Sequence, residues 1–233
     1  LLRQVLAIAD ERYAMPGFVK DPLDELEGPM PGVLHKYRSR VLVIYRGGCA
    51  INCRYCFRRH FPYQENTLTA RDIDGLVSYL KAHPEVNEVI LSGGDPLMAD
   101  DQALSGLFGR LESVSSIHRL RIHTRLPIVI PERVTDTLCQ TIAATALPVV
   151  MVLHSNHANE IDQSVMDAVS QLRGVCRSIL NQSVILKGIN DSADVLIALS
   201  ERLFEAGIDP YYLNVLDRVS GAHHFDVSDL EVA

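Results

Sequence analysis

Six short apolar runs rich in β-branched residues alternate along this chain with longer stretches of helical pattern. Runs of this length and spacing predict parallel strands joined by right-handed helical crossovers, because a parallel connection needs about a dozen residues or more. The predicted strands are 41–46, 88–92, 119–124, 149–154, 179–186 and 210–216. The predicted helices are 69–82, 101–112, 132–145, 161–173 and 192–206.

Six strands rather than eight indicate an α/β fold of the open, partial (βα)6 TIM-type barrel. A chain of 233 residues with 47% hydrophobic content can bury one large core. We divide it into a Pro- and Gly-punctuated lead-in over 1–40, the partial barrel over 41–221, and a C-terminal segment over 222–233. Because the first residue is Leu rather than Met, we expect the chain to be part of a longer protein.

Charge and hydropathy exclude several classes of protein. The formal net charge of −7 does not favour a nucleic-acid surface. No apolar run reaches the roughly 18 residues of a membrane helix, and the start lacks the order of a secretion signal. Five cysteines, three of them clustered, favour metal binding in a reducing compartment over disulfides, so we expect a cytoplasmic protein.

The unusual side chains fall where the predicted strands end. Carboxyl ends of parallel strands meet at one edge of a sheet, which is where such folds bind their ligands. The segments concerned are GGCAINCRYCFRRHFPY (47–63), SGGDP (92–96), HTRLP (123–127), HSNH (154–157), Asn181 with Gln182, and LDRVSG (216–221). We therefore predict one site at this edge.

Cys49, Cys53 and Cys56 follow a C-x3-C-x2-C spacing on the loop after the first strand. Three thiolates can hold a [4Fe–4S] cube and leave one iron open to another ligand. The residues alone leave two alternatives open. One is a zinc ion with His60 as fourth ligand, and the other is a redox or purely structural cysteine cluster. The two remaining cysteines, Cys139 and Cys176, are predicted to lie in the core.

The cysteine loop, with Tyr55 before its last cysteine, resembles the signature of the radical S-adenosylmethionine enzymes. SGGDP resembles the glycine-rich motif with which that superfamily holds the methionyl amino group, which assigns Ser92, Gly93, Gly94 and Asp95 to S-adenosylmethionine binding. Glycines allow the backbone to approach a ligand closely, and Asp95 or nearby carbonyls can accept hydrogen bonds from an ammonium group.

From about residue 16 onward the resemblance is to the lysine 2,3-aminomutases. The continuation CFRRHFPY is similar to one branch, the elongation factor P (R)-β-lysylation protein B type. This implies an isomerase that converts L-α-lysine to (R)-β-lysine with a 4Fe–4S cluster, S-adenosyl-L-methionine and pyridoxal 5′-phosphate. It implies free lysine as substrate, with a downstream β-lysine ligase and elongation factor P as partners. The sequence leaves open whether the protein forms a homo-oligomer. The matching blocks include HKYRSRVLVIYRGGCAINCRYCFRRHF, VILSGGDPL, RIHTRLPIVIPERVT, HSNHANEI, LNQSVILKGINDS and PYYLNVLDRVSGAHHF.

The resemblance also assigns roles residue by residue. Cys49, Cys53 and Cys56 match the cluster ligands. Arg58 matches the arginine that binds the substrate α-carboxylate, a task suited to a planar guanidinium, and a surface salt bridge is the alternative for it. Asp217 matches the carboxylate that pairs with the side-chain ammonium, although it could be a turn or helix-cap residue.

The other assigned positions concern the two organic cofactors. His154 and Gln182 match polar residues that help to hold S-adenosylmethionine, and a satisfied core histidine is the alternative for His154. Lys36, Tyr37 and Arg40 match positions near the phosphate of pyridoxal phosphate.

The sequence departs from the family in two respects. No lysine matches the one that forms the Schiff base with pyridoxal phosphate, and Lys187 is a poor candidate. Asn214 stands where a larger polar residue is expected. Two other functions stay open, namely aminomutation of another amino acid and a non-catalytic iron–sulfur or zinc-binding fragment. Asp217 argues against an anionic substrate side chain, because like charges would face each other.

Overall fold

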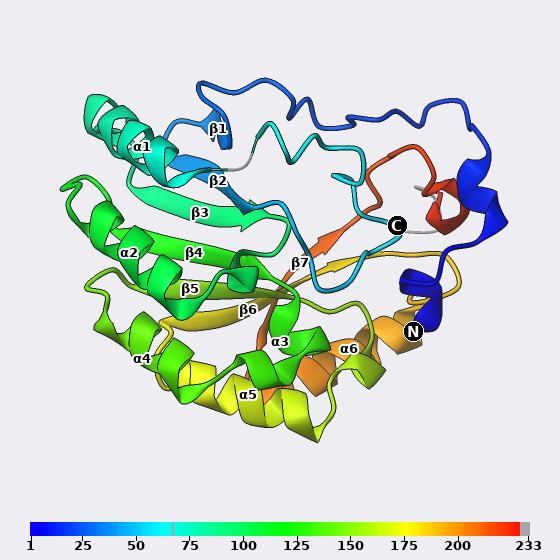
Figure 1. Cartoon of the computed structure of the whole chain (residues 1–233). Helices are drawn as coiled ribbons and strands as arrows, with labels where there is room; N and C mark the ends of the chain where they lie inside the picture. Colours follow the sequence, from blue (N-terminus) through cyan, green and yellow to red (C-terminus); the bar gives the residue numbers. More distant parts are fainter. Residues whose placement is uncertain (67, 229–233) are drawn as a thin grey trace.

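A computed structural model of the chain describes residues 1–66 and 68–228, with a seven-stranded sheet at its centre (Figure 1). The strands lie in sequence order across the sheet. The last six are parallel, as the alternating pattern predicts, whereas the first pairs antiparallel with the second. This is the expected partial barrel with one added edge strand. The strands are β1 (Val33–Tyr37), β2 (Arg40–Arg46), β3 (Glu88–Gly93), β4 (Arg119–Thr124), β5 (Val149–His154), β6 (Ser178–Val184) and β7 (Asp209–Asn214).

Helices cover one side of the curved sheet (Figure 1). Their apolar side chains, such as Leu104, Leu138 and Val169, are fully buried against Leu91 and Ile122 of the strands and form the main core. The helices are α1 (Ala70–Ala82), α2 (Asp101–Glu112), α3 (Leu126–Val129), α4 (Asp136–Ala144), α5 (Gln163–Arg173) and α6 (Ala193–Ala206). Short 3-10 turns lie at Leu2–Gln4, Ala9–Arg12, Pro96–Met98, Pro131–Arg133, Ala158–Glu160 and His223–Phe225. Among the described residues, no helix is long and apolar enough to cross a membrane.

Three elements differ from the sequence prediction, and one of them is the short helix α3, which was not expected. The antiparallel strand β1 was not expected in the lead-in, because its sequence VLHKY is short and ends in exposed polar residues. The predicted helix 132–145 is shorter, since α4 begins at Asp136 behind Thr135, whose Oγ1 accepts from Leu138 N at 3.1 Å. Gly207 ends α6 in the left-handed conformation at φ 75°, which favours glycine.

The lead-in passes along the carboxyl ends of the strands and meets the chain after β7 (Figure 1). Val19 and Val219 form a parallel bridge, and Ser220 Oγ donates to the Phe18 carbonyl at 3.1 Å. Beneath them, Tyr55 and Phe225 belong to a second, smaller core. This core joins the cysteine loop to the predicted C-terminal segment, whose last five residues, 229–233, lie outside the described residues.

Candidate functional site

The cysteine loop and the glycine turn pack directly against each other at the ends of β2 and β3. Asp95 N donates to the Gly48 carbonyl at 2.8 Å, and Gly94 N donates to the Arg46 carbonyl at 2.7 Å. A Cβ atom on Gly94 would lie 2.3 Å from the Gly48 oxygen, which is too close for any side chain. Gly93 has φ +116°, a conformation that favours glycine. The glycines are therefore needed to seat the cysteine loop.

The Asp95 carboxylate accepts four hydrogen bonds from the protein. Its donors are Thr124 Oγ1 at 2.6 Å and the backbone N–H groups of Leu97, Arg125 and Leu126 at 3.0, 2.8 and 3.0 Å. The carboxylate thus ties the end of β3 to the end of β4. The sequence offered two kinds of acceptor for a ligand ammonium group at this turn, namely Asp95 and nearby backbone carbonyls. Because the Asp95 carboxylate is used within the protein, the backbone carbonyls are the acceptors that would face the ligand.

The three clustered cysteines are free thiols that differ in exposure. Cys49 is exposed, while Cys53 and Cys56 are half-buried. Burial raises the pKa of Cys56, and the neighbouring Cys53 sulfur raises it further. A bound group with positive charge would therefore favour the thiolate form of Cys56. An iron–sulfur cluster supplies that charge, so the donor set fits such a group.

The zinc alternative requires His60 to join the cysteines. Its Nε2 instead lies 3.0 Å from the Ser220 carbonyl oxygen, to which it donates a hydrogen bond. Within residues 1–66 and 68–228, no three His, Cys, Asp or Glu side chains converge on a site for a single ion. This arrangement does not favour zinc.

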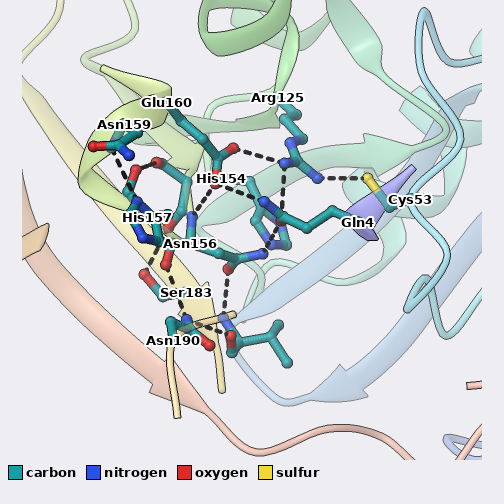
Figure 2. A network of polar contacts seen from close by, with 12 residues as sticks. Gln4, Cys53, Arg125, His154, Asn156, His157, Asn159, Glu160, Ser183 and Asn190 are labelled. Carbon is teal, nitrogen blue, oxygen red and sulfur yellow. Dashed lines mark hydrogen bonds and ion pairs between the residues drawn. The ribbon is translucent and has the colours of Figure 1, made fainter. Parts of the chain in front are cut away.

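Arg125, directly after β4, is the centre of a polar network around the cysteine loop (Figure 2). Its Nη1 donates to Cys53 Sγ at 2.8 Å and also contacts the Tyr55 hydroxyl. Its Nη2 donates to Glu160 Oε2 at 2.7 Å and Gln4 Oε1 at 3.1 Å. The lead-in, the cysteine loop and the turn after β5 therefore share one guanidinium group.

His154 ends β5 on the other side of Tyr55 and pairs in register with Gln182 of β6. Burial, together with the charges of Arg125 and His123, lowers the pKa of His154 to about 3, so the ring is neutral at pH 7. Its Nε2 lies 3.4 Å from the Tyr55 hydroxyl. The structure thus brings His154 and Gln182 together beside the cysteine loop.

Arg58 is buried, and its guanidinium donates hydrogen bonds to two side chains. Nε donates to Glu25 Oε2 at 2.6 Å and Nη1 donates to Ser92 Oγ at 3.1 Å. Glu25 also lies 3.7 Å from Lys36 Nζ. Burial raises the pKa of Asp217, the charge of Glu25 raises it further, and Arg58 lowers it. Two of the predicted residues, Arg58 and Lys36, therefore pair with Glu25, which the sequence pattern did not indicate.

The remaining predicted positions lie further out. Arg40 stacks on the exposed Tyr37 ring at 4.4 Å, and its Nε is buried without a hydrogen-bond partner among the described residues. Lys187 and Asn214 are exposed, Asn214 at the end of β7. Cys139 and Cys176 pack against the main core, as predicted.

Several residues that build the site were not singled out from the sequence. Arg125 lies within the HTRLP segment, so its place after a strand was the available signal. Gln4, Glu25 and Glu160 lie in the lead-in or in a short 3-10 turn, where no periodic pattern marks them. Only the folded chain brings them to the cysteine loop.

Comparison with known proteins gives consistent results at the levels of sequence and fold. Residues 43–145 match the Radical SAM superfamily. The chain is 54% identical to L-lysine 2,3-aminomutase of Escherichia coli strain K12 over 231 residues, which are 99% of this chain and 68% of that protein. It is 52% identical to L-lysine 2,3-aminomutase of Haemophilus influenzae over 232 residues, 99% of this chain and 69% of that protein. The solved structure of a radical SAM methyltransferase from Sphaerobacter thermophilus matches in fold with a TM-score of 0.54 at 14% identity, over 77% of this chain and 57% of the other.

Proposed function

The chain belongs to the L-lysine 2,3-aminomutase family of the radical SAM superfamily, and from this we propose that its reaction converts L-α-lysine to (R)-β-lysine. It is therefore an isomerase of the radical SAM aminomutase type. The observation that supports the choice of substrate is that the charge of Arg58, a cation, acts on Asp217, an anion, and lowers its pKa. A diamino acid such as lysine carries an α-carboxylate, which needs a cationic partner, and a side-chain ammonium group, which needs an anionic partner.

Cys49, Cys53 and Cys56 would hold the [4Fe–4S] cluster, and Ser92 to Asp95 with His154 and Gln182 would hold S-adenosylmethionine. When bound, the cluster supplies an electron, S-adenosylmethionine the radical, and pyridoxal phosphate the activation of the migrating amino group. The protein contributes fixed geometry. The contact between Gly94 and Gly48 sets the cysteine loop against the proposed S-adenosylmethionine turn.

Arg58 would bind the α-carboxylate of lysine and Asp217 its side-chain ammonium group. Asp217 lines a cavity of about 360 Å³ together with Gly17, Val19, Pro22 and Asp226. Burial there raises the pKa of Asp217, so a cationic partner such as the lysine ammonium would be needed to keep the carboxylate charged. The two residues would orient lysine and so decide which carbon faces the radical.

Pyridoxal phosphate would lie near Lys36, Tyr37 and Arg40. Within the described part of the chain, the Arg40 Nε is a buried donor without a partner, and a phosphate oxygen could accept from it. The exposed ring of Tyr37 lies over the same guanidinium. The Arg40 donor therefore fits the phosphate group.

We also assign the product to the modification of elongation factor P through a β-lysine ligase. This rests on the CFRRHFPY continuation of the cysteine loop, which is similar to that branch of the family. Aminomutation of an anionic amino acid is the competing function, and Asp217 and Asp226 in the same cavity disfavour it. A chain with no catalysis would not require partners for both ends of a diamino acid.

The test uses the protein with all three cofactors under anaerobic conditions, with dithionite as reductant. Lysine, glutamate and alanine are supplied separately, and products are separated on a chiral column. We expect (R)-β-lysine from lysine and no β-amino acid from the other two. A product from glutamate alone would contradict the proposed substrate, and a bound cluster with no product from any amino acid would favour a non-catalytic role.

A further inference from the structure

Arg125 presents one edge of its guanidinium group to a cysteine sulfur. Nη1 lies 2.8 Å from Cys53 Sγ, and its contact with the Tyr55 hydroxyl fixes the same nitrogen from the other side. The side chain is about a tenth exposed, so water does not screen this contact strongly. Arg125 therefore places a nearly dry positive charge against one of the three sulfurs.

The position of this charge is fixed by neighbours on three segments. Arg125 N donates to Asp95 Oδ2 at 2.8 Å, and Nη2 donates to Glu160 Oε2 at 2.7 Å. Glu160 is itself held, because its Oε1 accepts from Asn156 N and from Gln4 Nε2, both at 3.0 Å. The distance from Nη1 to Cys53 Sγ is thus determined by the ends of two strands (Figure 2).

The other two cysteines have different surroundings. Cys49 is exposed to solvent, and Cys56 has Arg58 and Arg59 nearby as charges. Arg58 and Arg59 direct their own hydrogen bonds to Glu25 and Glu11. Among the described residues, the charged side chain that donates to a sulfur of the cysteine loop is therefore Arg125.

We propose that Arg125 sets the reduction potential of the cluster by donating a charge-assisted hydrogen bond to the Cys53 sulfur, with Glu160 as the residue that positions it. The inference rests on the proposed assignment of Cys53 as a cluster ligand. A hydrogen bond to a cluster sulfur and a nearby positive charge both stabilise the reduced, more negative state. Arg125 therefore raises the potential and eases the electron transfer with which the reaction begins.

A purely structural role for Arg125 makes a different prediction. Its contacts with Gln4 and Glu160 would then matter only for stability, and every variant that keeps the cluster would keep the wild-type potential. Arg133 provides a matched control because it is partly buried, pairs with Asp101 at 2.7 Å and donates to the carbonyls of Leu97 and Ala99. These partners do not include a cysteine.

The experiment compares reconstituted holoenzyme carrying Arg125→Met, Arg125→Gln or Arg133→Met with the wild type. Iron and sulfide are counted first, and the potential is then measured by redox titration followed by electron paramagnetic resonance. We expect about four irons per chain in all four proteins. The potential should be more negative in both neutral Arg125 variants and unchanged in Arg133→Met.

A wild-type potential in either neutral variant that retains the cluster would overturn the inference. If neither takes up a cluster, Arg125→Lys decides, because an ammonium keeps the charge but loses the planar donor fork. A smaller negative shift is then expected, and an unchanged potential would overturn the proposal. Wild-type protein that holds zinc without sulfide would instead contradict the proposed function.

Discussion

Arg58 Nε and Glu25 Oε2 are 2.6 Å apart, and both side chains are less than a tenth exposed. The guanidinium proposed to bind the substrate carboxylate thus already has a carboxylate partner from the lead-in. Asp21 holds that partner in place, because its carboxylate accepts from Glu25 N at 3.0 Å and from Leu26 N at 3.2 Å. Glu25 therefore weakens the field of Arg58 at the place where lysine would bind.

We expect Glu25→Gln to lower the KM for lysine by roughly threefold to tenfold, because a hydrogen bond to a charged group contributes about 1.5–3 kcal/mol and only part of that is recovered. Steady-state kinetics of the holoenzyme measure the change. Glu27→Gln is the control, since Glu27 is exposed on the same segment. A higher KM in Glu25→Gln would mean that Glu25 supports the function of Arg58 and does not compete with the substrate.

Asp217→Asn should reduce the turnover of lysine roughly tenfold to a hundredfold, because the charge-assisted pair with the side-chain ammonium is lost. Uncoupled cleavage of S-adenosylmethionine should stay near the wild-type rate, since Asp217 is assigned to lysine. Asp226→Asn, a change in the same cavity, is the control and should have a smaller effect. Turnover of lysine at the wild-type rate in Asp217→Asn would show that another carboxylate binds the ammonium group.

Replacing Cys49, Cys53 or Cys56 with Ala should each abolish uptake of the cluster, since three thiolates are needed to hold it. Cys139→Ala should take up the wild-type amount, because Cys139 packs against the core away from the loop. Iron and sulfide analysis after anaerobic reconstitution gives the result. Full iron and sulfide content in any of the three loop variants would remove that cysteine from the set of ligands.

Gly94→Ala should destabilise the fold by about 2 kcal/mol or more, because the added Cβ would meet the Gly48 oxygen and the backbone must shift. Gly106→Ala should be neutral or stabilising by up to about 1 kcal/mol, since Gly106 lies inside α2 with open space around it. Chemical denaturation of both variants measures the free energy of unfolding. Equal stability of Gly94→Ala and the wild type would show that the two loops can separate without cost.

The low pKa of Glu11 leads us to expect that the fold loses stability in acid. Burial alone raises its pKa, but hydrogen bonds from Arg59, the Ile8 backbone and Arg54 outweigh this and bring the pKa of Glu11 to about 2. Because the pKa of Glu11 is lower in the folded than in the unfolded state, its charged form stabilises the fold above about pH 4.5. This contribution to the free energy of unfolding is about 3 kcal/mol at most, and it disappears as the pH falls toward 2.

The wild type should therefore have a higher Tm than Glu11→Gln at pH 6, and the gap should close near pH 2. Thermal unfolding followed by circular dichroism measures both proteins. Glu27→Gln again serves as the exposed control and should show no such gap. A gap of constant size from pH 6 to pH 2 would show that the charge of Glu11 does not stabilise the fold.

The six parallel strands could be predicted because each is a local apolar run between helical patterns. β1 could not, since hydrogen bonding to β2 rather than burial holds its exposed end. The cysteine loop and the glycine turn were visible as motifs because all of their functional atoms come from a few consecutive residues. Glu25 and Glu160 could not be identified, because each acts only through a partner distant in sequence, Arg58 or Arg125.

The closure of the lead-in onto the chain after β7 has a consequence for the order of folding. Gln4 reaches Glu160, Arg54 reaches His224, and Ser220 reaches Phe18 across 156, 170 and 202 positions of the chain. Contacts of such separation form late, since the entropy of closing the loop between them must be lost first. The sheet should therefore assemble while the cysteine loop is still open. Iron and sulfide would have free access during that interval, and the two end segments would close over the loop afterwards.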